Sequence, residues 1–584
     1  MDILFPSATE TAVFASISIT LIIMLMKKCL FTILFVSGIL ISCHKETVYS
    51  NIDLESDSSV MDAKIDYCCT DGEMVLGDKI EIPYSIENLK KAFYRLPLET
   101  RSSISIENIV TTHYYVRFHP KNEEELSILK NNSNLMLFEF PLDREIIING
   151  TSYHDPSLPD DMPTYQYATI EAGYWENYSR TLPVEYEVLI EAYIPDYYDT
   201  ETKSFAFDDG MVELMRKAYE MTGHEYTPET KADPWYPEGT IKAYDNIAGR
   251  LVPIPSLRVR GIHLLRTVEA LTDINGYYKF PNSFKNKTTM KIVWESDRWD
   301  IRDGNVVQAY YNGPKIFRQD WNVDIPDGDS KALRYAAIHR AAYRHYYGNN
   351  LFLARPNNSR KEKIGYIHDD IDKGTTNGDY NQQWGSGVWS DIRIAGRNAN
   401  GWRKPSEIFS TVCHELGHAA HYTNSTSYYK KSETRVLESW ARFVQYILTR
   451  QEYIELGVED LLVEKSTIDI DGEKYLMEYP DVQYNFQYMN FSEAGKATGN
   501  TAIYTPVFID LYDDYNQSLY YYNNDPNHYP DDKIKDVEPA VIQLLVFLSV
   551  SFDEIKAKLI KDYCKYVNTN NITEENINAL FSVY

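Results

Sequence analysis

The segment 411–421, with the sequence TVCHELGHAAH, constrains the fold of this chain more than any other segment does. Residues four apart in an α-helix lie one turn apart on the same face. His414 and His418 can therefore direct two imidazoles to one point, with Glu415 beside them. Two neutral imidazoles suit Zn²⁺, and a catalytic zinc takes a third protein ligand and keeps one position open for water. A neighbouring carboxylate can accept a proton from that water, so the segment predicts two zinc ligands and a general base on one helix.

The residues around this segment support a helix. Pro405 and Ser406 mark its start, because Ser is a good N-cap and Pro stops an earlier helix from running on. Glu407 lies in the first turn, where the helix dipole favours negative charge. An apolar stripe recurs at helical spacing and can pack into a core, at Ile408, Val412, Leu416 and Ala419. Both histidines lie off this stripe, so they can face a cleft.

A third ligand is expected from a second helix over residues 432–448. Ser432 is a candidate N-cap, and Glu438 lies off the apolar face of this helix. That face consists of Val436, Trp440, Phe443, Ile447 and Leu448. Nineteen residues separate His418 from Glu438, which is enough to leave the first helix and return a second helix across it.

The pattern His-Glu-x-x-His, nineteen residues and then Glu resembles that of the gluzincins, the zinc peptidases that include the thermolysin-like enzymes. The resemblance implies one zinc ion held by His414, His418 and Glu438, with Glu415 as the catalytic base. It implies a zinc-dependent endopeptidase that hydrolyses peptide bonds of extracellular proteins or glycoproteins through a zinc-bound water. The metzincin pattern does not fit, because it requires Gly at position 421 and His at position 424, where this chain has His421 and Asn424. We interpret His421 as a residue behind the metal ligands or facing solvent.

Two further features bear on this resemblance. Gluzincins supply a Tyr or His that stabilises the oxyanion, and Tyr504 and His528 are the candidates here. Arg442 departs from the thermolysin-like pattern, which has Asp at that position to support a zinc histidine. The alternative is a non-catalytic surface lipoprotein that binds glycan or host protein, with its zinc structural or absent.

Residues 1–43 form a targeting segment. Lys27 and Lys28 precede an apolar run, Cys29–Ile41, and the run ends at Cys43. This order resembles a bacterial lipoprotein signal, in which Cys43 becomes the lipidated N-terminus, and we interpret Met26 as the translation start. The resemblance implies a bacterial cell-envelope protein, in the outer membrane or at the cell surface, that a lipid anchor holds on the membrane. The earlier apolar run 12–25 is an alternative as a transmembrane helix.

Length and charge bound the remaining possibilities. A chain of 584 residues is long enough for several domains, and its 43% hydrophobic content suits a globular protein. The formal net charge of −27 argues against a nucleic-acid partner, whose phosphates would be repelled. The expected partners are a protein or glycoprotein substrate and the membrane, and the oligomeric state is not indicated.

The predicted fold class is multidomain α+β. A polar tether over 44–85 is expected to lead into an N-terminal α/β module over 86–233. In that module a βαβ unit is predicted with strands over 113–118 and 134–140 around a helix over 122–130. Two further helices are predicted over 182–194 and 208–221.

Residues 234–328 are predicted to form an Ig-like β-sandwich. Asn275-Gly276 stands between apolar runs as a strong hairpin signal. The surrounding Thr-Asp-x-x-Gly-x-Tyr pattern is similar to that of the carboxypeptidase regulatory-like domain, which implies an accessory role without catalysis.

Residues 329–584 are predicted to form a zincin-like, mainly helical peptidase domain with a small sheet. The first helix is expected over 332–347 and a strand over 388–394. Residues 389–394 are expected to be the edge strand that pairs with an extended substrate. The helices expected after Glu438 span 500–514, 541–548, 552–561 and 573–581, with Ser551 and Thr573 as caps.

Overall fold

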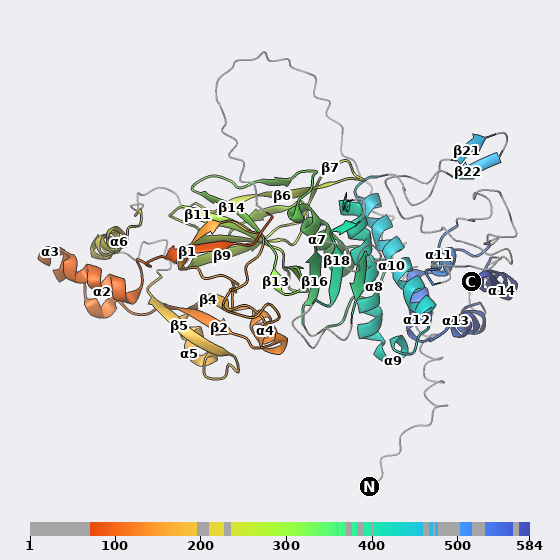
Figure 1. Ribbon diagram of the computed structural model, residues 1–584, viewed down its shortest axis with the longest axis horizontal. Coiled ribbons are helices and arrows are strands. Elements are labelled where there is room, and N and C mark those ends of the chain that lie inside the picture. The colour runs from red at the N-terminus through yellow and green to blue at the C-terminus, as the bar shows by residue number, and fades with distance from the viewer. Residues whose placement is uncertain are drawn as a thin grey trace, which may run out of the picture.

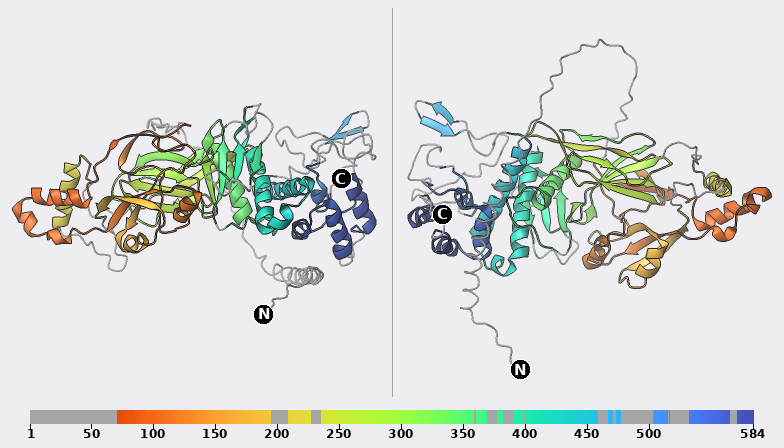
Figure 2. Two further views of the ribbon diagram at one scale, coloured as in Figure 1. Left: turned by 60° about the horizontal axis from the view of Figure 1, so that its bottom comes forward. Right: turned by 180° about the vertical axis from the view of Figure 1, so that it is seen from behind.

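The computed structural model describes most of the chain. The described residues are 71–194, 209–226, 235–358, 360–368, 377–381, 390–398, 401–458, 467–470, 473–476, 503–514, 516, 532–564 and 571–584. This part mixes α-helices with several small sheets, in agreement with the predicted α+β class. Figures 1 and 2 show an elongated molecule with α2 (Ile86–Arg95) and α3 (Leu98–Ser102) at one end and the last helices at the other. None of the helices in this part is long and apolar enough to cross a membrane.

Residues 71–85 do not belong to a tether as predicted. Strand β1 (Val75–Lys79) pairs antiparallel with β3 (Arg144–Ile148), and Met74, Ile82 and Tyr84 are buried. These apolar side chains pack with α2 and α6 (Asp209–Met221) in one cluster, so the ordered region begins before the predicted boundary at residue 86.

The N-terminal sheet is antiparallel, and the predicted βαβ unit is wrong. Strand β2 (His113–His119) lies between β4 (Gln166–Glu171) and β5 (Glu185–Ala192) and is antiparallel to both. Helix α4 (Glu123–Lys130) follows β2 as predicted, but residues 134–140 form no strand and make only an isolated bridge from Phe138. Helix α5 (Ala172–Tyr178) follows β4.

The helix predicted over 182–194 is also wrong, because β5 occupies this segment. Tyr186, Val188 and Ile190 alternate with Glu185, Glu187 and Glu191, which is the period of a strand with two different faces. Pairing with β2 selects this extended form.

Two four-stranded sheets follow, and both contribute to one hydrophobic core. The first contains β6 (Glu238–Asp245), β7 (Arg250–Pro253), β10 (Tyr277–Lys279) and β15 (Val323–Ile325). The second contains β8 (Arg258–His263), β9 (Arg266–Leu271), β11 (Thr288–Val293) and β14 (Tyr310–Ile316).

The Asn275-Gly276 turn forms, but it does not close a hairpin. Gly276 has a positive φ of 75°, and the Asp273 carboxylate accepts from the Asn275 and Tyr277 amides. Strand β10 then pairs with β6, while β9 pairs with β8. The turn therefore carries the chain from one sheet to the other, and the predicted hairpin pairing is wrong.

A five-stranded sheet follows, with the strand order β13-β12-β16-β18-β17. Its strands are β12 (Trp299–Asp303), β13 (Val307–Gln308), β16 (Glu362–Ile367), β17 (Gly378–Tyr380) and β18 (Ile392–Ala395). The short antiparallel strands β19 (Arg397–Asn398) and β20 (Gly401–Trp402) precede α8 (Pro405–Asn424). Because β12 pairs in parallel with β16, the sheet takes strands from both sides of the predicted boundary at 329.

The edge strand is not the one predicted. Strand β18 lies between β16 and β17, so residues 392–394 are internal, and Trp389 lies outside the described residues. The antiparallel strand β17 occupies the edge instead. Ile392 and Ile394 are buried on one face of β18 and Ala395 on the other, which suits an internal strand, whereas β17 is short and polar at Asp379.

Two long helices pack on this sheet, namely α7 (Lys331–Tyr347) and α8 (Pro405–Asn424), and a third, α10 (Thr434–Glu455), packs on α8 (Figure 1). Helix α8 contacts both α7 and α10. Pro405 is its first residue, and the Glu407 carboxylate accepts from the Lys404 amide. Ser406 and Ser432 are therefore not the N-caps, and Glu433 precedes α10 instead.

The C-terminal helices complete the core around α10. They are α11 (Val507–Asp510), α12 (Pro539–Phe547), α13 (Phe552–Lys558) and α14 (Glu574–Val583). Ser551 and Thr573 cap the last two as predicted. The helix expected over 500–514 shrinks to α11, because Pro506 lacks an N–H and starts the helix anew.

Candidate metal centre

Three side chains from two neighbouring helices converge at one point. His414 Nε2 lies 3.2 Å from His418 Nε2 and 3.2 Å from Glu438 Oε2, and His418 Nε2 lies 3.3 Å from the same oxygen. The two histidines lie one turn apart on α8, and Glu438 reaches them from α10. The three ligand atoms therefore form a nearly equilateral triangle, as the sequence spacing predicts.

The triangle fits a metal ion better than it fits a hydrogen-bonded cluster. Two nitrogen ligands about 2.1 Å from a tetrahedral zinc are separated by roughly 3.4 Å, close to the separations here. Without a cation, two imidazole nitrogens at 3.2 Å must share one proton. Two imidazoles and one carboxylate are also the ligand set of catalytic zinc sites with an open fourth position.

Glu438 is held in its charged form. Burial raises the pKa of this carboxyl, but His418 and His414 outweigh burial and keep the pKa well below the usual range. A cation bound by the three side chains would take over this role from the imidazoles, because it needs an ionised carboxylate and neutral histidines.

Glu415 lies beside the triangle in a different environment. Its side chain is buried, and burial together with Glu438 and Asp379 raises its pKa to about 8, while His414 and Arg403 act in the opposite direction. Gly378 of β17 lies directly against it, since a Cβ at Gly378 would lie 3.0 Å from Glu415 Oε1. Helix α8 and the edge strand β17 therefore meet at Glu415.

Tyr504 lies next to the triangle. Its ring centroid is 6.0 Å from that of His414, and the residue is 39% exposed, which leaves it accessible to a substrate. Burial, the carboxylates of Glu438 and Glu415 and a hydrogen bond to Glu438 raise the pKa of Tyr504. The phenol is therefore a hydrogen-bond donor at neutral pH.

Side chains of helix α10 hold Tyr504 in place by hydrogen bonds to the main chain of residues 503–505. Ser439 Oγ donates to the Ile503 carbonyl over 3.2 Å and accepts from the Thr505 amide over 3.0 Å, and Arg442 donates to the Tyr504 carbonyl. Arg442 therefore anchors the segment that carries Tyr504.

Tyr429 is a neighbour of the site that sequence reasoning missed. Its hydroxyl lies 3.5 Å from His418 Nδ1, the ring nitrogen opposite the ligand atom. A contact on that side orients a metal-ligating imidazole, which is the function that Asp has in the thermolysin-like pattern. No spacing rule points to Tyr429, because it is the last residue of the short helix α9 (Thr426–Tyr429), which lies in the connection between the helices that carry the ligands.

His421 is not solvent-facing. It is fully buried, and its ring stacks on Phe547 with centroids 4.7 Å apart and an interplanar angle of 3°. Burial and the nearby His418 lower its pKa to about 3, so it is neutral at physiological pH. Cys413, next to His414 in the sequence, is fully buried in the core.

Two candidate residues fall outside the described residues, namely His528 and Cys43. Among the described residues, the cluster of His414, His418 and Glu438 is the group of His, Cys, Asp and Glu side chains able to hold a metal ion. No protein-family model matches the chain, and no curated protein matches it.

Proposed function

We propose that this protein is a zinc-dependent endopeptidase acting on extracellular proteins or glycoproteins. The observation that carries the proposal is the triangle of His414, His418 and Glu438, with the buried carboxylate of Glu415 beside it. A structural zinc site has four protein ligands, whereas three ligands and an adjacent carboxylate are typical of hydrolytic sites.

The chemistry follows from the positions of these side chains. A zinc ion held by the three ligands would supply Lewis acidity and lower the pKa of a water towards about 7. Glu415 is the group that accepts the proton of the attacking water and passes it to the leaving amine. Burial raises the pKa of Glu415 and a cation bound beside it would lower this pKa again, and a carboxylate poised near neutral pH can both accept and release a proton.

Tyr504 completes the proposal as the oxyanion stabiliser. Its neutral hydroxyl borders the ligands, and a donor aimed at developing negative charge accelerates acyl transfer. The Tyr504 hydroxyl hydrogen-bonds Glu438 in the structure, so on substrate binding it would donate to the substrate oxygen instead of to Glu438.

Strand β17 is the proposed docking strand for the substrate backbone. It is the edge strand next to α8, and an extended peptide can add to such an edge by main-chain hydrogen bonds. Gly378 lets this strand approach Thr411 and Glu415, because a Cβ there would lie 2.7 Å from Thr411 Cγ2. Peptide binding at β17 would place the scissile bond near the candidate base.

The lipoprotein signal belongs to the same proposal. Acylation of Cys43 would hold the protein in the bacterial cell envelope, facing extracellular proteins. Loss of membrane association in a Cys43→Ser variant, measured by fractionation, would support this location.

The test is metal analysis combined with cleavage of a casein and gelatin panel. Wild-type protein is expected to hold one zinc per chain and to cut the panel. Glu415→Gln is expected to keep the zinc and lose about 10²–10⁴-fold in rate. Glu455→Gln, an exposed substitution on α10, serves as the matched control and should cleave at the wild-type rate. Cleavage by Glu415→Gln at the parental rate would contradict its role, and wild-type protein without zinc or cleavage would favour the non-catalytic surface lipoprotein.

A further inference from the structure

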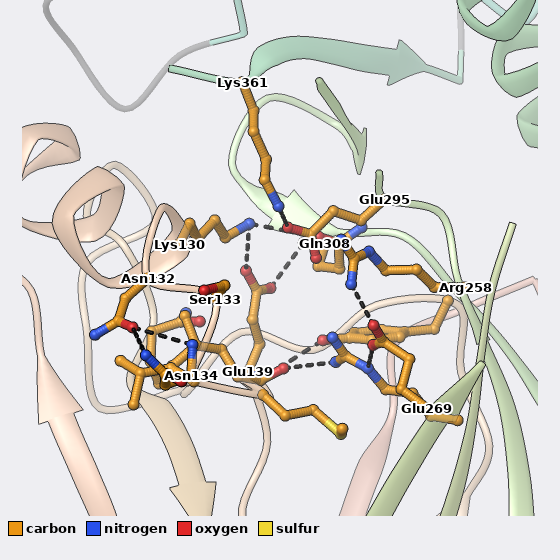
Figure 3. A pocket seen from close by; sticks show the side chains of 16 residues that line it. Lys130, Asn132, Ser133, Asn134, Glu139, Arg258, Glu269, Glu295, Gln308 and Lys361 are labelled. Carbon is orange, nitrogen blue, oxygen red and sulfur yellow. Dashed lines mark hydrogen bonds and ion pairs between the residues drawn. The ribbon is translucent and has the colours of Figure 1, made fainter. Parts of the chain in front are cut away.

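A charged pocket of about 250 Å³ lies between the loop after α4 and strands β8 and β9 (Figure 3). Lys361 pairs with Glu295, and Arg258 pairs with Glu269. Because these charges pair with one another, the charged pocket gives no indication of a ligand.

Three tyrosine rings form a continuous wall beside the candidate metal centre. The ring centroids of Tyr380 and Tyr422 lie 6.2 Å apart, and those of Tyr422 and Tyr429 lie 5.5 Å apart. The Tyr429 ring centroid also lies 6.3 Å from that of His418. Each of the three tyrosines is partly exposed. This tyrosine wall therefore extends outward from a candidate ligand and keeps aromatic surface accessible.

Helix α8 places Tyr422 on the side of the helix that carries Glu415 and His418. Tyr422 follows His418 by four residues and Glu415 by seven, and residues at these spacings share one face of a helix. Four residues rise roughly 6 Å along the helix axis. The tyrosine wall therefore begins one turn beyond the second histidine, on the side of α8 where the candidate base lies.

Strand β17 brings Tyr380 to the same side. Gly378 and Tyr380 are two residues apart, so their side-chain positions face the same side of the strand. That side is turned towards α8, because a Cβ at Gly378 would lie 2.7 Å from Thr411 Cγ2. Gly378 lies beside Thr411 and Tyr380 beside Tyr422, so β17 and α8 run in the same direction.

A buried arginine fixes the spacing between β17 and α8. Arg403 is 1% exposed, and its guanidinium donates to the Asn377 carbonyl over 2.9 Å and to Thr411 Oγ1 over 2.7 Å. On the other face of β17, Arg393 Nε donates to Asp379 Oδ1 over 2.9 Å. The strand is therefore held in place before a peptide binds, which reduces the entropic cost of binding.

The direction of β17 determines which part of a substrate meets the tyrosine wall. An extended peptide that adds antiparallel to β17 runs opposite to α8. Its residues N-terminal to the cut bond then lie towards Tyr380 and Tyr422, and its C-terminal residues lie towards Thr411. Two residues of an extended chain span roughly 6.6 Å, close to the rise from His418 to Tyr422. The wall is therefore within reach of the first or second residue before the cut bond.

The tyrosine wall offers uncharged aromatic surface. Burial raises the pKa of Tyr380 and of Tyr429, so both phenols are neutral at physiological pH. Lys430 Nζ lies 5.7 Å from the ring centroid of Tyr422, so a basic substrate side chain would meet a like charge. Aromatic rings pack favourably at centroid separations of about 4.5–7 Å, as these tyrosines do. A further aromatic ring can continue this packing.

We propose that Tyr380, Tyr422 and Tyr429 form the subsite that selects an aromatic side chain one or two residues before the cut bond. The inference rests on the proposed peptidase function and names the substrate class of that same site. The edge strand holds the peptide backbone, and the tyrosine wall stabilises the aromatic side chain.

The test digests an equimolar peptide library with the zinc-loaded full chain and maps the cut bonds by mass spectrometry. Phe, Tyr or Trp is expected at the first or second position before the cut bond. Replacing that residue by Ala in the best substrate should lower kcat/KM about 10-fold to 100-fold. Cleavage without this preference, or with a preference for basic residues there, would overturn the subsite alone. Absence of any cleavage would contradict the peptidase proposal and the subsite with it.

Two variants locate the preference in the tyrosine wall. Tyr422→Ala and Tyr380→Ala are each expected to lower the ratio of kcat/KM for the aromatic peptide to that for its Ala counterpart about tenfold, with unchanged zinc content. A general loss of stability affects both peptides equally and leaves this ratio unchanged.

Tyr94→Ala is the matched control, because Tyr94 is 65% exposed on α2 at one end of the elongated molecule (Figure 1). It should keep the wild-type ratio. If one wall variant fails to fold, the other decides. A wild-type ratio in every folded wall variant would overturn the subsite.

Discussion

The metal centre and the charged pocket are both clusters of partly buried polar groups, but they differ in how their charges are balanced. At the metal centre, the Glu438 carboxylate faces two imidazoles, and no Lys or Arg of the described segments pairs with it. In the pocket, Glu295 and Glu269 each pair with a Lys or Arg. Among the described residues, the carboxylate of Glu438 therefore has no Lys or Arg partner, whereas Glu295 and Glu269 each have one.

This difference explains what each cluster can bind. Three converging ligand atoms without a counter-charge are stabilised by an external cation. Charges that are already paired add little attraction for an ion and leave only hydrogen bonds for a ligand. Four experiments test the roles of these charged and buried groups, and the largest effect is expected at the candidate metal ligands.

Removing the anionic ligand should have the largest effect. In Glu438→Gln the amide is a poor zinc ligand, so we expect zinc affinity to fall by more than about 100-fold and peptidase activity to vanish. Equilibrium dialysis with metal analysis measures the affinity. Glu455→Gln on the same helix should retain both zinc and activity. Full zinc occupancy in Glu438→Gln would remove Glu438 from the site.

Breaking the ion pair between Lys361 and Glu295 should lower the free energy of unfolding and leave zinc binding unchanged. Lys361→Met leaves the Glu295 carboxylate without its nearest cation, and we expect a loss of about 3 kcal/mol in the free energy of unfolding. The double variant Lys361→Met/Glu295→Gln should recover most of this loss, because no charge stays unpaired. Denaturant unfolding measures both. Equal stability of the single variant and wild type would show that the pocket charges are not mutually dependent.

Low pH should reduce the free energy of unfolding even in protein without zinc, because two histidines far apart from the candidate ligands in sequence are buried in their neutral form. His339 is fully buried, accepts from Trp299 Nε1 and lies 2.9 Å from the Pro255 carbonyl, and burial lowers its pKa to about 4. Burial lowers the pKa of His345 to about 4 as well. Both histidines bind protons near pH 6.5 when unfolded, so the unfolded state holds more protons between pH 6.5 and 4.

The direction of the effect follows from this linkage. Their contribution is complete above about pH 6.5 and declines as the pH falls towards 4, by at most about 1.4 kcal/mol per pH unit for each histidine. Unfolding in chelator at pH 7 and pH 5 measures it. His339→Gln, which keeps a donor and an acceptor, should show a smaller pH dependence. An unchanged dependence in that variant would assign the acid sensitivity elsewhere.

The smallest effect is expected next to the ligands. Tyr429→Phe removes the hydroxyl that lies against His418 Nδ1, and we expect zinc affinity to fall about tenfold. Tyr428→Phe, at the adjacent exposed position, is the control. Competition with a chromophoric chelator measures both affinities, and equal values would show that Tyr429 does not orient the ligand.

The two clusters also differ in how far the sequence predicts them. His414, His418 and Glu438 lie on consecutive long helices, where a fixed periodicity and a short connection place the side chains. The spacing therefore predicted their convergence and placed Glu415 beside them. The pocket unites Gln166, Arg258 and Lys361, which no local period connects.

The strand pairings that were predicted wrongly also depend on contacts between distant segments. Strand β5 pairs with β2 across a separation of 70 residues between Arg117 and Glu187, and β10 pairs with β6 and not with its sequence neighbour β9. The choice of strand partner depends on tertiary packing, which a single sequence window does not contain. The alternating glutamates of β5 were a usable signal, whereas nothing local indicated that β17 would replace β18 at the sheet edge.

X-ray absorption at the zinc edge of the zinc-loaded full chain tests the central claim most directly. The account predicts a first shell of nitrogen and oxygen at about 2.0–2.1 Å, with outer-shell scattering from two imidazoles and no sulfur. A sulfur shell near 2.3 Å, a shell without imidazole, or failure of the protein to retain zinc would contradict it.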